Sequence, residues 1–477
     1  MPSDSSIAGV LRGHGWLLVP VLLVWLLLLR PVNDVDIFWQ LRLGDLMLDS
    51  GWLITREPFA ATHLNEPLPQ LSVLAQLLLA LMRRIAGWRG VQLIDALAWS
   101  GGFVAAGLAA RRRGAGNLAL GLALVVCIAV AFPFSGLRPQ SFAVLGFGLL
   151  LLLVQHQTLR FGTWLGLGAA LLVLWQNLHP SVSVAAIYLA ARGGPGWLAW
   201  LGWLGPERRA APPWHETALC LIAALATFAT PAGFGVLAVS LANAQQSVAM
   251  GATEWLSLLD PASRDFLPWF AVLHAVIGVL VFQHRRSLDL ADIAGAVVFL
   301  VMALVSARFM LFWALALVPL AAGREPGSKK AAGSRAALLL YPAGALLALL
   351  LVILRGPVTM DSGIPVQGIE RLKAAGIKGT IFCGFAFGGP VIDAGWPDWQ
   401  VGFDGRYWRY SDAEWSLYRD ILAGKADLAA ITTRYRPSAW LLSTVTDPAL
   451  IAALRADTSH WREIQADATS VTFIPRP

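Results

Sequence analysis

The sequence predicts an α-helical protein that crosses a membrane several times and ends in a small α/β domain. Of its 477 residues, 57% are hydrophobic and 14% are charged, whereas about 25% are charged in an average soluble protein. The mean hydropathy is +0.63. Leucine- and alanine-rich runs recur between short charged patches. We expect these runs to be helices, because lipid offers no partner to unpaired backbone groups.

About eleven apolar runs are long enough to cross a bilayer. The first, residues 16–29, is long for the core of a signal peptide, and no small-residue cleavage site follows it, so we expect a retained helix. We therefore assign residues 1–355 to a transmembrane domain with a first outer loop at 31–90. The predicted spans lie near 15–30, 91–110, 117–134, 141–156, 163–177, 182–203, 216–239, 266–283, 290–305, 308–322 and 336–355.

One further apolar stretch, residues 71–82, is short for a span and suits an interfacial or re-entrant helix. If it does not cross, four positive clusters fall on the cytoplasmic side, as the positive-inside rule requires. In return, Arg83, Arg84 and Arg89 fall outside. The four clusters are Arg111 with Arg112 and Arg113, Arg208 with Arg209, Arg285 with Arg286, and Arg324 with Lys329, Lys330 and Arg335.

This orientation predicts a multi-pass protein of the bacterial inner (plasma) membrane with a cytoplasmic N-terminus. The outer segments include the long first loop, a loop of about 240–265 and everything after about 356. The cytoplasmic connections are short and offer nothing beyond positive charge, so we expect any chemistry on the periplasmic face. The net charge of +7 does not indicate a nucleic-acid partner. The reason is that arginine and lysine lie in clusters between apolar runs, and the expected partners of such clusters are membrane lipids.

The composition changes after Gly356. Alternating apolar segments at 380–382 and 439–442 indicate strands, and 413–423 has a helical pattern. Residues 356–477 are thus predicted to form a small periplasmic α/β domain, in which Asp404 and Arg406 would pair within a turn. The three cysteines, Cys127, Cys220 and Cys383, are too scattered to suggest a disulfide framework or a metal site.

The first outer loop contains two carboxylates, Asp34 and Asp36, just outside a predicted membrane helix. Such a pair can act as a general base, or Asp36 can ligate a divalent cation such as Mg²⁺ or Mn²⁺. The alternative is structural: acidic residues at a helix start cap it and favour the positive end of its dipole. The spacing alone leaves both interpretations open.

Two arginines lie at the predicted outer ends of helices. Arg138 is a lone cation before Pro139 and Gln140, and Arg308 lies between two apolar runs. Guanidinium groups bind phosphate in a bidentate fork and stay charged when partly buried. The alternative is that both side chains extend to lipid headgroups.

Two more outer segments have polar groups suited to a sugar or a phosphate. Asn177 and His179 interrupt an apolar stretch, and Glu254 precedes Trp255. A histidine can donate to phosphate, and an aromatic ring beside an acid suits sugar stacking. The alternatives are a histidine that only bonds a helix end and a tryptophan that marks the membrane interface.

Taken together, these residues resemble the GT-C glycosyltransferases, and more closely a group of bacterial GT-C-like membrane proteins. The likeness covers nearly the whole chain. In two places the chain departs from that pattern: Gln40 stands where a histidine is expected, and Pro180 with Ser181 where small glycines are usual. The matching segments are Asp34-Val35-Asp36 with Trp39 and Gly44, Leu137-Arg138-Pro139-Gln140, 175–179, Glu254-Trp255, Arg308, and Asp404-Gly405-Arg406.

The resemblance implies sugar transfer from a polyprenyl-phosphate-linked donor to an unknown acceptor, with inversion at the anomeric carbon. By analogy, Asp34 or Asp36 would be the general base. Arg138 and Arg308 would bind the departing phosphate, and the other residues implied in substrate binding are Trp39, Gln40, Gln140, Asn177, His179, Glu254 and Trp255. Two alternatives remain: a transporter or flippase of a lipid-linked sugar, and a non-catalytic membrane assembly protein.

Overall fold

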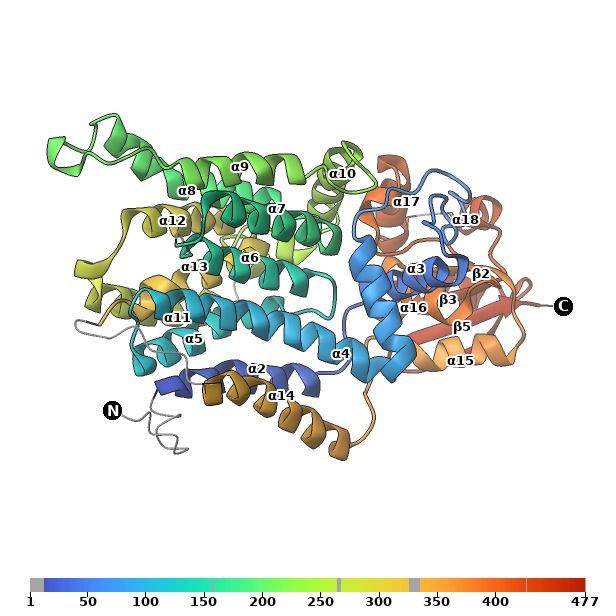
Figure 1. Cartoon of the computed structure of the whole chain (residues 1–477). Coiled ribbons are helices and arrows are strands. Elements are labelled where there is room, and N and C mark those ends of the chain that lie inside the picture. Colours follow the sequence, from blue (N-terminus) through green and yellow to red (C-terminus); the bar gives the residue numbers. More distant parts are fainter. Residues whose placement is uncertain (1–12, 157, 264–266, 326–334, 426, 477) are drawn as a thin grey trace. The chain divides into compact units, whose positions relative to one another are not determined.

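The computed structural model describes residues 13–156, 158–263, 267–325, 335–425 and 427–476. The chain forms two compact units, each built from segments that are distant in sequence. Unit 1 comprises Met1–Arg30, Trp88–Gly233 and Ala252–Pro357, and unit 2 comprises Pro31–Gly87, Phe234–Gly251 and Val358–Pro477. Figure 1 labels many of the elements of both units. Two residues of the last predicted cytoplasmic cluster, Lys329 and Lys330, lie outside the described residues.

Unit 1 consists of apolar helices around one core. By length and composition, three of the described helices could cross a membrane: Val73–Arg112, Asn117–Phe134 and Phe161–Leu178. The other apolar helices are shorter, so the total of about eleven spans stays a prediction. The helices of this unit are α2 (Leu18–Leu29), the second part of α4 (Val73–Arg112), α5 (Asn117–Ala131), α6 (Gln140–Val154), α7 (Phe161–Leu178), α8 (Ser183–Trp200), α9 (Trp214–Ala226), α11 (Leu267–Gln283), α12 (Leu290–Val305), α13 (Met310–Ala322) and α14 (Arg335–Arg355).

The single helix predicted over 216–239 is wrong. Helix α9 ends at Ala226, and a separate helix, α10 (Gly235–Ala249), follows and belongs to unit 2. Between them, Pro231 has no backbone N–H to donate, and Gly233 has a φ of +51°, a conformation that favours glycine. The apolar composition continues across this turn and therefore concealed it.

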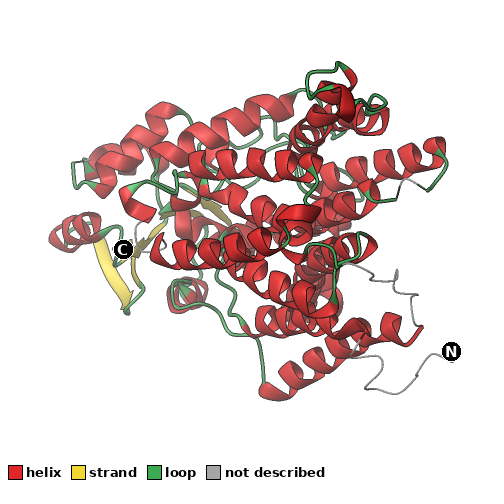
Figure 2. Cartoon of the chain, turned by 90° about the vertical axis from the view of Figure 1, so that its left-hand side faces the viewer, coloured by secondary structure: helices red, strands yellow, loops and turns green. Residues whose placement is uncertain are grey.

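Unit 2 contains a five-stranded sheet with the order β2-β1-β3-β5-β4. Strand β1 pairs in parallel with β2 and β3, whereas β5 pairs antiparallel with β3 and β4. The strands, yellow in Figure 2, confirm those predicted at 380–382 and 439–442. The elements are α3 (Asp36–Ser50), the first part of α4, α10, α15 (Val366–Ala374), β1 (Gly379–Cys383), α16 (Phe385–Gly395), β2 (Trp399–Val401), α17 (Asp412–Leu422), α18 (Leu428–Tyr435), β3 (Ala439–Ser443), α19 (Pro448–Ala456), β4 (Trp461–Ala466) and β5 (Ser470–Pro475).

Helix α4 is interrupted between its two parts. Ala86 has a φ of −136° and Gly87 a φ of 57°, so both residues depart from helical geometry. This interruption lies at the boundary between unit 2, whose segment ends at Gly87, and unit 1, which resumes at Trp88. The first part, which contains most of the segment predicted as an interfacial helix, packs on α3. Gly44 permits this contact, since a methyl group there would collide with the Gln76 carbonyl and with Ala80.

Arg83, Arg84 and Arg89, which the predicted orientation places on the outer side against the positive-inside rule, have hydrogen-bond partners within their own units. In unit 2, Arg83 donates to the Asp393 carboxylate at 2.7 and 2.8 Å and pairs with Asp45. Arg84 donates to Asp45 at 2.8 Å and to Asp49 at 2.7 Å. These ion pairs join α3, α4 and α16. Arg83 and Arg84 therefore have a structural role in unit 2.

A buried ion cluster ties the segment predicted as the first outer loop to the tail within unit 2. The Arg406 guanidinium donates to Glu57 at 2.6 and 2.9 Å and to Asp404 at 2.6 and 2.8 Å, which confirms the ion pair predicted within the 404–406 turn. All three side chains are fully buried. Burial opposes the ionisation of Asp404, but Arg406 outweighs this effect and lowers the pKa of Asp404.

We expect Arg406→Met to lower the free energy of unfolding of unit 2 by about 3–5 kcal/mol, because two buried carboxylates lose their cation. Thermal unfolding of the full chain in detergent, with limited proteolysis of the 57–66 loop, measures the change. The matched control is Arg434→Met, since Arg434 is 45% exposed where it pairs with Glu414 and should cost only about 0–1 kcal/mol. Equal effects of the two substitutions would contradict this account.

A second link between this loop and the tail depends on pH. His63 lies 3.1 Å from Glu414, whose segment begins α17 with a capping box, and 2.9 Å from Glu66. The hydrogen bond to Glu414 raises the pKa of His63, although burial opposes the shift. Because the folded-state pKa is raised, the stabilisation is complete below the unfolded pKa of about 6.5 and is lost as the pH rises through the folded-state value.

Hydrogen exchange tests this link. At pH above 6.5, we expect the protection factors of the Asn65 and Glu66 amides, which donate within the loop, to fall. In His63→Gln they should be low and independent of pH between 6 and 8.5. A wild-type loop that is equally protected across this range would rule out the His63 contribution.

Candidate functional site

Three of the predicted site segments meet in unit 1. Arg138, just before α6, pairs with Glu254 in the turn η4 (Thr253–Trp255). The guanidinium of Arg308, in the turn η7 (Ala307–Phe309), lies 3.9 Å from the centre of the Trp255 ring. The two turns are joined by a backbone hydrogen bond from Ala307 to Leu256 of 2.9 Å. Residues up to 170 positions apart in the sequence therefore form one cluster.

The electrostatics of this cluster favour anions. Burial raises the cost of ionising Glu254, but the charges of Arg138 and Arg308 outweigh it and lower the pKa of Glu254. Two guanidinium groups and one ionised carboxylate carry a net charge of +1 among the three side chains. Guanidinium groups match the geometry of phosphate oxygens.

His179 belongs to the same end of unit 1. Its Nδ1 lies 2.8 Å from the Ser181 hydroxyl, which accepts a hydrogen bond of 3.0 Å from the Trp175 indole. Burial, together with the charges of Arg308 and Arg138, lowers the pKa of His179 to about 3. The imidazole is therefore neutral at physiological pH and offers a hydrogen-bond donor or acceptor without adding charge.

Two other predicted residues of unit 1 have a more structural setting. Asn177, near the end of α7, donates to the backbone carbonyls of Val173 at 2.9 Å and Ala229 at 2.7 Å, and so ties α7 to the segment after α9. Gln140 is buried at the start of α6, next to the Arg138 turn. Ser181, which the sequence analysis did not select, orients His179.

The two acidic candidates lie in unit 2, at the start of α3. Asp34 Oδ1 accepts a hydrogen bond of 3.0 Å from the backbone N–H of Asp36, the first residue of the helix. The N-cap of α3 is Val35, with no side-chain capping hydrogen bond, so Asp34 bonds the first helical amide from one residue outside the cap and Asp36 lies in the first turn. Asp36 Oδ1 accepts a hydrogen bond of 3.1 Å from the indole of Trp39. The indole thereby fixes the orientation of the Asp36 carboxylate.

Two glycines of the tail let its backbone pack closely against the segment that contains Asp36. The sequence analysis did not identify this role for them. A methyl group on Gly405 would collide with the Asp36 carboxylate, and one on Gly389 with the Val35 carbonyl. The Arg406 guanidinium also lies 5.7 Å from the centre of the Trp39 ring. Only the folded chain reveals these glycines, because they approach a segment more than 350 positions away. Gln40 instead accepts a hydrogen bond of 2.7 Å from Gln76 between α3 and α4.

The predicted divalent cation at Asp36 has few candidate ligands. Among the described residues, no three His, Cys, Asp or Glu side chains form a group that could hold a metal ion. Asp34 and Asp36 each direct Oδ1 to an N–H group of their own segment. A hard cation here would depend on the remaining carboxylate oxygens and on water. This donor set is a poor fit, and the cation stays a prediction.

The acids that a transporter would need within helices are paired. Asp95 on α4 pairs with Arg30, and Asp292 on α12 pairs with both Arg113 and Arg192. An ionisable group within a membrane helix is a candidate for transport by default. Here each carboxylate has a guanidinium partner, so the pairs have an evident structural role.

No protein-family model and no curated protein matches the chain. The chain does match solved structures. ArnT from Cupriavidus metallidurans bound to undecaprenyl phosphate aligns with a TM-score of 0.54 at 12% identity, over 96% of this chain and 98% of that one. Its apo state gives 0.53 at 13% identity, over 96% and 97%. The oligosaccharyltransferase of Archaeoglobus fulgidus in the apo form gives 0.50 at 11% identity, over 91% and 70%.

These similarities show a GT-C-like fold, as the sequence analysis expected. With its apolar helices, the chain is a multi-pass membrane protein. At 11–13% identity the similarities do not extend to the activity.

We expect Glu254→Gln to destabilise unit 1 by about 1–2 kcal/mol, since two partly buried arginines lose a shared carboxylate. Millimolar inorganic phosphate should raise the Tm of this variant more than that of the wild type, because an anion replaces the missing charge. Thermal unfolding in detergent with phosphate or chloride measures both effects. Glu207→Gln, at an exposed glutamate of unit 1, is the control, and an equal phosphate response in both variants would contradict the expectation.

Proposed function

We propose that this chain is a membrane glycosyltransferase that moves a sugar from a polyprenyl-phosphate-linked donor to an acceptor on the periplasmic face. The observation that carries the proposal is the Arg138–Glu254–Arg308 cluster with neutral His179. It combines phosphate-binding cations with the fold of a protein solved with undecaprenyl phosphate.

In the proposed reaction, the acceptor hydroxyl attacks the anomeric carbon of the donor sugar. A new C–O bond forms as the bond from that carbon to the phosphate oxygen breaks, and the configuration inverts. The phosphate takes the bonding electron pair and leaves as polyprenyl phosphate. Negative charge therefore develops on the phosphate, where Arg138 and Arg308 would stabilise it.

The acceptor proton needs a base, and Asp36 is the better of the two acidic candidates. Its Oδ1 is oriented by the Trp39 indole, whereas the Asp34 Oδ1 is engaged by the first amide of α3. Asp34 would then order the loop and Asp36 would take the proton. His179, being neutral, would donate a hydrogen bond to the donor. Trp255, with its ring against Arg308, would hold that guanidinium and offer an apolar face to the sugar or lipid.

Release of polyprenyl phosphate tests the proposal without knowledge of the acceptor. The purified full chain is reconstituted with cell-envelope extract as the acceptor source and a panel of polyprenyl-phosphate-linked pentoses and hexoses. We expect one donor to be consumed. Asp36→Asn should lower the rate by about 10²–10⁴-fold with donor binding retained, whereas Arg308→Gln should weaken donor binding as well as the rate.

Asp49→Asn is the matched control, since this aspartate lies at the far end of α3, is 67% exposed and pairs with Arg84. It should keep the wild-type rate. Unchanged rates in both Asp36→Asn and Asp34→Asn would overturn the assignment of the base. Transbilayer movement of the donor without a new glycosidic bond would instead indicate a flippase.

A further inference from the structure

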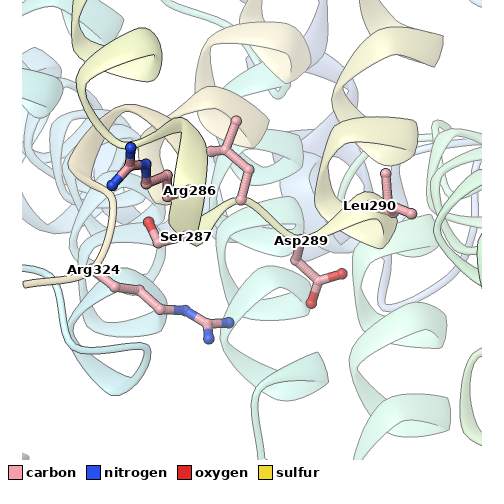
Figure 3. A pocket seen from close by; sticks show the side chains of 6 residues that line it. Arg286, Ser287, Asp289, Leu290 and Arg324 are labelled. Carbon is pink, nitrogen blue, oxygen red and sulfur yellow. The ribbon is translucent and has the colours of Figure 1, made fainter. Parts of the chain in front are cut away.

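An open pocket of about 370 Å³ lies in unit 1, lined by Arg286, Ser287, Leu288, Asp289, Leu290 and Arg324. Figure 3 shows the Arg324 side chain reaching across it toward Asp289, with Ser287 beside the arginine and Arg286 at the edge. Neither the proposed reaction nor the comparisons give this pocket a role. Its volume falls in the range of small-molecule sites.

The pocket lies at the opposite end of two helices from the candidate active site. Helix α12 starts at Leu290, in the pocket, and runs for 16 residues to Val305, just before the Arg308 turn. Helix α13 starts beside Arg308 and ends at Ala322, just before Arg324. A helix of this length spans about 24 Å. The pocket is therefore a separate site, on the predicted cytoplasmic side.

The surroundings of the pocket favour an anion. Arg324 and Arg286 supply two cations against the single carboxylate of Asp289. The Ser287 hydroxyl donates its proton to the His284 carbonyl at 2.9 Å, so it lines the pocket without serving as a donor. That carboxylate is partly engaged, because its Oδ1 accepts the backbone N–H of Ala291 and caps α12. Phosphate oxygens suit guanidinium donors and the positive end of a helix.

The helices that meet at the pocket expose apolar stripes on their surfaces. On α11, Val272, Val276, Val279 and Phe282 recur at helical spacing and are all exposed. Leu290, Val297 and Val301 do the same on α12. In a membrane helix such a stripe faces acyl chains. The acyl chains of a phospholipid can therefore pack on these stripes while its phosphate binds at the pocket. Basic pockets between membrane helices are known to bind anionic lipid headgroups in this way.

We propose that this pocket binds a phosphate group, carried by an anionic phospholipid or free in solution, with Arg324 as its main ligand and Arg286 as a further donor. The apolar stripes favour the lipid as the source. The proposal does not depend on the glycosyltransferase activity, because its residues lie at the other helix ends.

Binding to the purified full chain in zwitterionic detergent tests the proposal. Three probes are titrated separately and followed by native mass spectrometry and Tm: short-chain phosphatidylglycerol, short-chain phosphatidylcholine and inorganic phosphate. We expect phosphatidylglycerol to bind more tightly than phosphatidylcholine. Arg324→Gln should weaken this binding about tenfold, the size of one lost charge-assisted hydrogen bond, and the double variant with Arg286→Gln should weaken it further.

A second substitution is expected to tighten phosphate binding instead of weakening it. Misfolding would not produce this result. Asp289→Asn removes the carboxylate but keeps the helix cap, since asparagine caps as well as aspartate, and it should tighten binding several-fold. Arg285→Gln is the matched control, because the Arg285 guanidinium lies 4.1 Å from the Phe282 ring and donates to the Phe282 carbonyl. It should leave binding unchanged.

The outcomes separate the two sources of phosphate. Phosphatidylglycerol binding that follows these variants supports the site with a lipid ligand. Inorganic phosphate binding that follows them, without lipid binding, supports the site with a soluble ligand. If neither probe responds to Arg324→Gln or Asp289→Asn, or if Arg285→Gln has the larger effect, the proposal is overturned.

Discussion

Arginine–carboxylate pairs hold together segments that are far apart in this chain. Arg406 reaches Glu57 across 349 positions and Arg83 reaches Asp393 across 310 within unit 2. In unit 1, Arg138 reaches Glu254 across 116. A buried charge without a partner costs several kcal/mol, so each pair forces its two segments to fold together. The segment predicted as the first outer loop consequently shares a core with the tail.

This pairing determines the geometry of the candidate residues. In unit 2 the Arg406 turn brings Gly405 against Asp36, while Trp39 orients the same carboxylate. A substitution in the tail can therefore displace an acid that lies more than 350 positions earlier. In unit 1 the hydrogen bond between the Glu254 and Arg308 turns has the same effect on the cations. Positioning in both units thus depends on long-range contacts made by short turns.

The sequence predicted the helices of unit 1 and the strands of the tail, because burial in lipid or in a sheet leaves a periodic apolar pattern. It failed over 216–239, where Pro231 and Gly233 break an apolar run whose composition does not change. It also identified Arg138 and Arg308 as charges at helix ends and Glu254 as a carboxylate beside an aromatic residue, but only one by one. Their meeting, like the roles of Gly389, Gly405 and Ser181, arises only from packing between distant segments, which no local pattern encodes.

The distribution of paired charges distinguishes the arginines of balanced ion pairs from the candidate site arginines in unit 1. Arg30 faces a single aspartate, and the Arg113–Arg192–Asp292 group also includes Glu216 at 3.8 Å from Arg192, so each group is balanced within the helix bundle. The Arg138–Glu254–Arg308 cluster instead places two cations around one acid, among turns, with a histidine that stays neutral. A phosphate would complete this arrangement at low cost, because the guanidinium groups are already fixed by an aromatic ring and a carboxylate and need little reorganisation to receive it.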